Sequence, residues 1–103
     1  MEKEEMLENL KNDVNETIGL YESFITGAAI ATRNMIERIG EVATLEKLVQ
    51  TSEGQLGFKK LYEHNQLDKS FEALVLKYKE LFSKNAYDFA NYRLKQPELF
   101  LNK

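Results

Sequence analysis

The sequence lacks cysteine and tryptophan, and its 103 residues include a single histidine and a single proline. Without thiols it cannot be a disulfide-linked mini-protein or a cysteine-ligated zinc module. One proline and five glycines exclude collagen-like and Pro/Gly-rich low-complexity chains. The longest apolar stretch, residues 24–31, is interrupted by Thr26 and is far shorter than the roughly 20 residues of a membrane-spanning helix.

The chain is 43% apolar and 30% charged, which is too apolar for full disorder and sufficient for one modest core. We therefore expect residues 1–103 to form a single domain. Residues 1–5 are acidic, whereas a secretory signal begins with basic residues, so we expect a cytoplasmic protein. Abundant Lys, Asn, Glu and Ile are typical of AT-rich bacterial or phage coding sequences and indicate nothing about mechanism.

The net charge of −3 conceals an asymmetry between the two halves of the chain. Residues 1–54 carry 5 basic and 11 acidic side chains, whereas residues 55–103 carry 9 basic and 6 acidic ones. Opposite charges of this kind attract within one monomer or head to tail between copies. The other interpretation is that surface charge simply varies along the chain.

Apolar residues recur every three or four positions over residues 3–39, which predicts an amphipathic helix. The repeating positions are Leu7, Leu10, Val14, Ile18, Tyr21, Phe24, Ala28, Thr32, Met35 and Ile39. Unbroken, this helix measures roughly 55 Å at 1.5 Å per residue, which is too long for a domain of about 13 Å radius of gyration to cover. It therefore either breaks at Thr26-Gly27 or pairs with another chain, and Gly40 is suited to end it.

Shorter helices follow, each with a start signal. Thr44 is predicted to cap a turn or two carrying Leu45 and Leu48, and Ser52 with Gln55 forms a capping box for a helix over 53–64. Asp68 or Ser70 caps a helix over about 70–81, and Ser83 begins a last helix that Pro97 ends.

The fold class that follows is all-α, with a long N-terminal amphipathic helix or helix pair over 1–40 and three or four short helices over 44–95. Residues 96–103 form a tail. Its apolar residues Leu99 to Leu101 either fold back on the core or act as a docking peptide.

Catalytic and metal-binding patterns are weak. His64 has Glu63 and Asp68 nearby, but helical metal sites usually need two histidines, or a Glu-x-x-His pair that this chain lacks. Ser52 and Ser70 lie near His64 in sequence without the glycine-framed turn of a nucleophile. We expect no enzyme activity, no metal and no cofactor.

Two helices around a short turn, over about 53–64 and 70–81, have the outline of a helix-turn-helix. The second helix would then read DNA bases with its first residues, which are Phe71, Glu72 and Ala73 rather than Arg, Asn or Gln. The sequence pI of about 5.2 also disfavours binding to phosphates. A DNA-binding regulator is thus the alternative, with nucleic acid an improbable partner.

We expect a non-catalytic, protein-binding helical protein, such as an adaptor, inhibitor or regulator, that docks through helix faces and self-associates as a dimer. The protein partner is unknown. Residues 27–29 and 31 are small enough for a close helix crossing, and Tyr87 and Tyr92 lie off the apolar stripe beside Arg93. The interface candidates are Tyr21, Ala28, Met35, Tyr87, Tyr92 and Arg93.

Overall fold

The computed structural model describes residues 2–24, 27 and 29–101. Its α-helices are α1 (Lys3–Phe24), α2 (Ile30–Gln50), α3 (Gln55–Glu63), α4 (Phe71–Lys77), α5 (Lys84–Lys95) and α6 (Pro97–Leu101). Single 3₁₀ turns, at Ser52–Gly54, Leu67–Lys69 and Lys79–Leu81, lie between them. No strand occurs in these described ranges, so the predicted all-α class with a long N-terminal helix is confirmed. The radius of gyration is 12.6 Å, close to the roughly 13 Å of a compact chain of this length.

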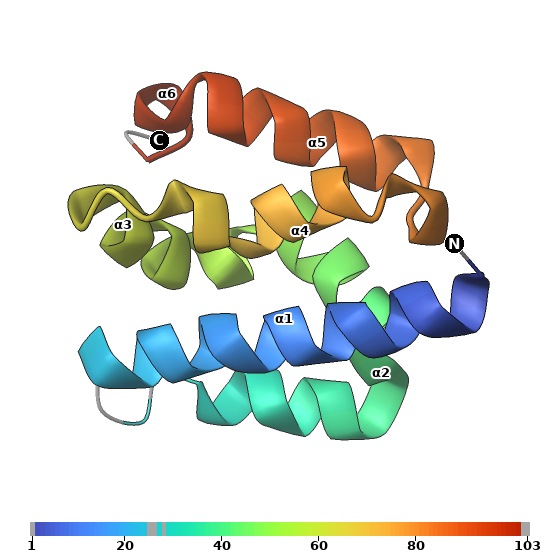
Figure 1. The fold of residues 1–103 in the computed structure, drawn as a ribbon. Helices are drawn as coiled ribbons and strands as arrows, with labels where there is room; N and C mark the ends of the chain where they lie inside the picture. Colours follow the sequence, from blue (N-terminus) through green and yellow to red (C-terminus); the bar gives the residue numbers. More distant parts are fainter. Residues whose placement is uncertain (1, 25–26, 28, 102–103) are drawn as a thin grey trace.

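The long N-terminal pattern is divided into two helices, as the sequence predicted for the region of Gly27. α1 ends at Phe24, Gly27 takes a positive φ of 78°, and α2 begins at Ile30. The two helices lie side by side at the bottom of Figure 1. The Arg33 guanidinium donates two hydrogen bonds, of 3.1 and 2.8 Å, to the Glu22 carboxylate across this hairpin. Because the helix is broken, the domain can cover both parts of it. The reason to expect pairing with another chain through one continuous helix is therefore removed.

A second change of direction occurs at Gly40, where φ is 84° and ψ is 168°. These angles interrupt the helix, as predicted, because glycine enters this region without a Cβ clash. Helical structure resumes at once rather than after a cap, so the prediction that Thr44 begins the next helix is wrong. Thr44 is fully buried within α2, and its hydroxyl has no hydrogen-bond partner among the described residues. Burial of the face with Leu45 and Leu48 outweighs the capping preference of threonine.

Caps at the later helices are partly as predicted. Ser70 accepts a hydrogen bond from the Ala73 amide at the start of α4, and Ser83 accepts one from the Ala86 amide at the start of α5. The predicted capping box at Ser52 is absent, because Thr51 instead accepts from the Glu53 amide and opens a 3₁₀ turn. The helix predicted over about 70–81 ends at Lys77 and continues as a separate 3₁₀ turn.

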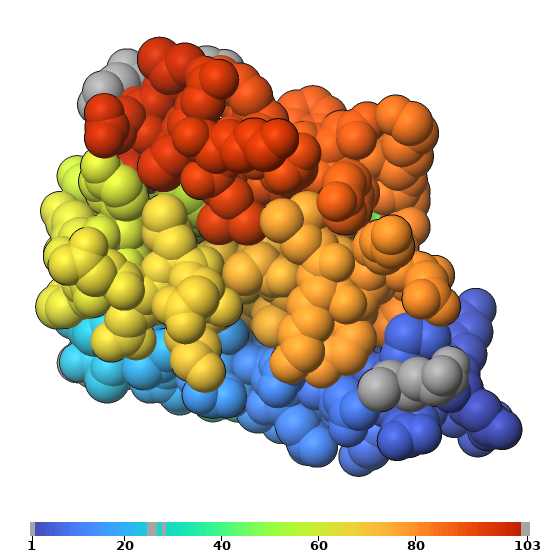
Figure 2. Space-filling model, turned by 45° about the horizontal axis from the view of Figure 1, so that its top comes forward, coloured from blue at the N-terminus to red at the C-terminus, as the bar shows by residue number. Residues whose placement is uncertain are grey.

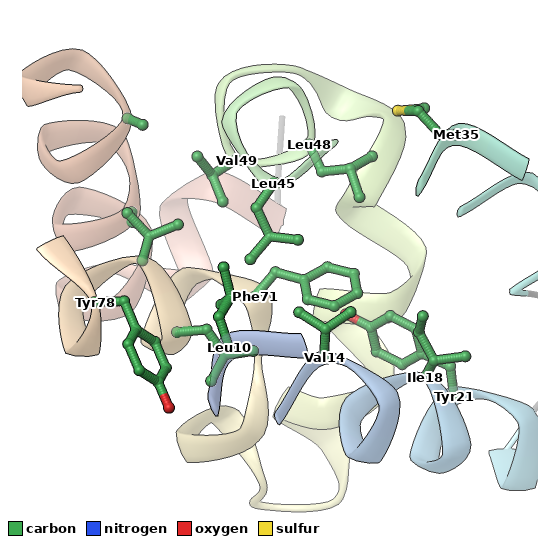
Figure 3. Packing of buried hydrophobic residues seen from close by; sticks show 14 of the residues in the cluster. Leu10, Val14, Ile18, Tyr21, Met35, Leu45, Leu48, Val49, Phe71 and Tyr78 are labelled. Atoms are coloured by element: carbon green, nitrogen blue, oxygen red, sulfur yellow. The ribbon is translucent and has the colours of Figure 1, made fainter. Parts of the chain in front are cut away.

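The elements form three levels around one buried cluster, with α1 and the first stretch of α2 below, α3 and α4 across the middle, and α5 with α6 above (Figures 1 and 2). Figure 3 shows the stripe of α1 turned toward α4 and the second stretch of α2. The largest wholly buried apolar side chains come from α1, α2, α3 and α4, namely Leu10, Val14, Ile18, Leu45, Val49, Phe58, Leu61 and Val75.

The two oppositely charged halves of the chain meet within the monomer. The ammonium of Lys77 lies 2.8 Å from the Asp13 carboxylate, and that of Lys69 lies 3.0 Å from Glu16. Both pairs join α1 to the segment that contains α4. Two ion pairs between the acidic and the basic half of the chain therefore form within one copy.

The segment after Pro97 folds back onto the core through residue 101. Proline occupies the first position of α6, where its missing N–H is no loss. The Phe100 side chain is buried against Phe58, with ring centroids 5.2 Å apart and planes at 82°. The Tyr62 hydroxyl donates a 2.9 Å hydrogen bond to Glu98. For residues 97–101 the fold-back interpretation of the tail is confirmed.

A tight contact between α1 and α3 generates a stability prediction. A Cβ added at Gly57 would lie 2.5 Å from Cζ of Tyr21, whose ring is buried and packed edge-on against Phe71. We expect Gly57→Ala to lower the free energy of unfolding by about 1–3 kcal/mol, because the added Cβ forces the buried Tyr21 ring out of its packed position. Urea titration followed by circular dichroism measures this change.

Gly19→Ala is the matched control, since Gly19 is also helical and a Cβ there meets nothing within 4 Å. That variant should be stabilised by up to about 1 kcal/mol through helix propensity. Equal effects of the two substitutions would contradict the proposed contact.

Candidate protein-interaction surface

Helix α5 buries small residues and exposes two large aromatic ones. Ala86, Ala90 and Arg93 face the core, whereas Phe89 is 47% exposed and Tyr92 is 40% exposed. The two alanines permit a close approach of α5 to α2 and α4, and Arg93 points inward on the same face of the helix. Phe89 and Tyr92 consequently lie one turn apart on the outer face.

A groove runs beside this pair of aromatic side chains. Its volume is about 220 Å³, and its walls come from the end of α2, the turn at 50–55, α5 and α6. The lining residues are Gln50, Thr51, Ser52, Gln55, Phe89, Tyr92, Arg93 and Phe100. An engineered apolar cavity of about 150 Å³ holds a benzene molecule. The groove is thus large enough for one aromatic side chain of a partner.

Arg93 forms the floor of the surface and is only 5% exposed. Its Nη1 donates to Glu72 Oε2 at 3.1 Å and to the Leu48 carbonyl at 3.0 Å, and its Nη2 donates to the Thr51 carbonyl at 2.8 Å. Those carbonyls belong to the end of α2, where helix carbonyls lack intrahelical partners and a cation is favoured. One guanidinium thus joins α5 to both α2 and α4.

Two further contacts hold the ends of α5. The Glu46 carboxylate of α2 accepts hydrogen bonds from the Ser83 amide at 2.6 Å and the Ser83 hydroxyl at 2.8 Å. At the other end, Phe100 stacks over the Arg93 guanidinium, with 4.0 Å from Cζ to the ring centroid. A helix fixed at both ends presents its outer side chains with little ordering left to do on binding.

The structure describes five of the six interface candidates, and they lie in different environments. Tyr21 and Met35 are core residues at 7% and 6% exposure, and Arg93 is buried beneath the groove. Ala28 lies outside the described residues. Tyr87 is half-buried on another side of α5, while Tyr92 lines the exposed groove.

Phe89 was not among the interface candidates of the sequence analysis, although it is the most exposed aromatic side chain on α5. The spacing of Ala86, Ala90 and Arg93 could have predicted this exposure, because these residues lie on one face of the helix. That face is recognised as the buried one only if the arginine is assumed to be buried.

The geometry of α3 and α4 disfavours the DNA-binding alternative. Phe71 and Glu72, at the start of the supposed recognition helix, are both 3% exposed and lie inside the fold. Reading bases with these residues would require α4 to leave the core. Three lysines on or near α4 and α5 that phosphates could attract, Lys69, Lys77 and Lys84, are ion-paired with carboxylates of the same chain.

A second polar hollow lies between α1 and α4, around Asp13. Its carboxylate accepts hydrogen bonds from the Tyr78 hydroxyl at 2.6 Å and from Lys77 at 2.8 Å. Burial acts to raise the Asp13 pKa, but these hydrogen bonds outweigh it and the pKa lies below its usual value. Burial and the bond to Asp13 raise the pKa of Tyr78. Both pKa values move away from neutrality, opposite to what acid–base catalysis requires.

Other residues considered for chemistry have structural contacts. The His64 ring stacks on Phe24 with centroids 4.1 Å apart. The Ser70 hydroxyl donates to the Leu67 carbonyl and accepts from the Ala73 amide, so its hydrogen-bonding capacity is used in the cap. Among the described residues there is no group of three His, Cys, Asp or Glu side chains arranged to bind a metal ion.

In the described part of the chain, no helix combines the length and apolar character needed to cross a bilayer. No family model, curated protein or solved structure matches the chain significantly. Functional inference therefore rests on the geometry of this chain.

The buried ion pair predicts a pH-dependent stability defect. Burial raises the pKa of Glu72, and the Arg93 guanidinium opposes that rise. Arg93→Met leaves the carboxylate buried without its partner, so at pH 7 we expect a loss of about 3–5 kcal/mol in the free energy of unfolding. Because the pKa of Glu72 is higher in the native state of the variant than in its unfolded state, the native state takes up the proton at a higher pH than the unfolded state. The loss of unfolding free energy should therefore shrink as pH falls from 7 toward about 4. Denaturant titrations across this pH range measure it.

The double variant Glu72→Met with Arg93→Met is the control, because it removes both charges. It should be much closer to wild type at pH 7 and should lack the acid rescue. A defect of Arg93→Met that is constant with pH would contradict the role of Glu72.

The Asp13 hydrogen bonds predict a second pH-dependent stability effect, although here the carboxyl pKa is shifted down rather than up. A lowered native pKa stabilises the fold above the unfolded value of about 3.9, and this stabilisation is lost as pH falls through the native pKa. We expect Asp13→Asn to lose about 1–2 kcal/mol of the free energy of unfolding at pH 7, and a progressively smaller amount as the pH is lowered below the unfolded value of about 3.9. Thermal melts at pH 7 and at steps below pH 4, with exposed Asp68→Asn as the control, test this prediction.

Proposed function

We propose that this chain is a non-catalytic, protein-binding helical protein of the cytoplasm, an adaptor or regulator that docks and self-associates through the outer face of α5. The observation that carries the proposal is the exposure of Phe89 and Tyr92 beside an aromatic groove on a firmly anchored helix. Aromatic side chains supply most of the energy in many protein interfaces.

The environment of the pair fits helix-face docking. Phe89 and Tyr92 project from one side of a 12-residue helix, and the turn at 50–55 and Phe100 form the opposite wall of the groove. An amphipathic partner helix places apolar side chains at similar intervals and lies along such a groove. The buried Arg93 network supports the floor, so the shape exists before the partner arrives.

A pair of matched variants tests the proposal. Phe89→Ser with Tyr92→Ser removes the aromatic pair, whereas Ile30→Ser with Leu56→Ser removes two side chains of similar exposure, 61% and 54%, from other helices. Each variant and the wild type carry a photo-reactive cross-linker in place of Asn85, which is exposed near the start of α5. They are cross-linked in cells of the native host, and the adducts are identified by mass spectrometry.

Adducts, whether with another protein or with the same chain, are expected from the wild type and the Ile30/Leu56 variant. They should be lost from the Phe89/Tyr92 variant, provided that melting curves show it folded. Retention of the same adducts by all three proteins, or no adduct from any, would overturn the proposed docking surface.

A further inference from the structure

The outer face of α5 is complementary to itself when two copies run antiparallel. An antiparallel copy centred on the midpoint between Phe89 and Tyr92, one residue past the middle of α5, places each Phe89 opposite the Tyr92 of the other chain. Asn85 and Gln96, both exposed, lie at equal distances from the same midpoint. They therefore also come opposite each other.

The charges on one flank of this face follow the same symmetry. Asp88 and Lys95 are exposed on the side of α5 next to the aromatic pair. In the antiparallel register defined by Phe89 and Tyr92, Asp88 of one copy and Lys95 of the other are offset by only about 3 Å along the helix axis, at 1.5 Å per residue. Antiparallel helices related by a two-fold axis bring like flanks together, so two Asp88–Lys95 contacts form across the dimer.

The Asp88 carboxylate is available for such a contact. Its side chain is 54% exposed, and its 2.8 Å ion pair with Lys84 involves only Oδ2. Lys84 lies near the far end of α5, so an antiparallel copy keeps the two Lys84 side chains well apart.

We infer that the occupant of the α5 surface is a second copy of this chain, bound as a two-fold symmetric dimer with antiparallel α5 helices. This inference rests on the proposed function, and it replaces the N-terminal helix with α5 as the dimer contact. The contact area is that of one 12-residue helix and the groove beside it, which is small for a dimer. Dissociation in the micromolar range is therefore expected.

Charge-reversed variants test the register. Asp88→Lys places a lysine against Lys95 of the other copy, and Lys95→Asp places two aspartates together. Each variant alone should dissociate at least about tenfold more readily than wild type. An equimolar mixture should pair as well as wild type, because both contacts then join a lysine to an aspartate. Sedimentation equilibrium over about 5–500 μM covers this affinity range.

The matched control replaces Asp88→Lys with Asp68→Lys, a reversal at an exposed aspartate on a different element. Asp68→Lys should dimerise like wild type and should not rescue Lys95→Asp. A wild-type protein that stays monomeric throughout, or a mixture that fails to pair when both variants are folded, would overturn the inference. If cross-linking then still detects another protein at α5, the proposed function stands and only the identity of the occupant is wrong.

Discussion

The arrangement of the upper helices depends on one buried guanidinium. Arg93 reaches from α5 into the space between α2 and α4, where it meets the Glu72 carboxylate and two main-chain carbonyls. A charge in such a place is tolerated only because these acceptors and the Phe100 ring surround it. The geometry of those partners leaves little freedom for the position of α5. The exposure of Phe89 and Tyr92 is a direct result of this constraint.

The lower half of the molecule is built differently. The apolar stripe of α1 packs against Phe71 of α4 and against Leu45 and Val49 of α2 (Figure 3). The ion pairs of α1 lie at the margins of this contact. Surface ion pairs of this kind contribute little stability. The core supplies the stability of the fold, whereas the buried polar network determines how one particular face is presented.

Much of the fold could be predicted from the sequence, because its signals are local. The period of apolar residues revealed α1, and glycine marked both changes of direction, at Gly27 and Gly40. Ser70 and Ser83 were recognisable caps. Thr44 was misinterpreted since its burial depends on helices distant in sequence. Of the candidate surface, Tyr92 was recognised, but Phe89 was not, because its exposure follows from the inward direction of Arg93.

The division of charge between the two halves has a consequence for assembly. The first 54 residues carry a net charge of −6 and leave the ribosome before the +3 segment that completes their core. Until that segment arrives, the stripe of α1 has no α4 to cover it, and mutual repulsion between copies of the acidic hairpin opposes aggregation. When the basic segment packs against the acidic hairpin, Lys69 and Lys77 come to lie beside Glu16 and Asp13 of the same chain. An uneven distribution of charge along the sequence would thus disfavour contact between two incomplete copies and favour contact within one chain.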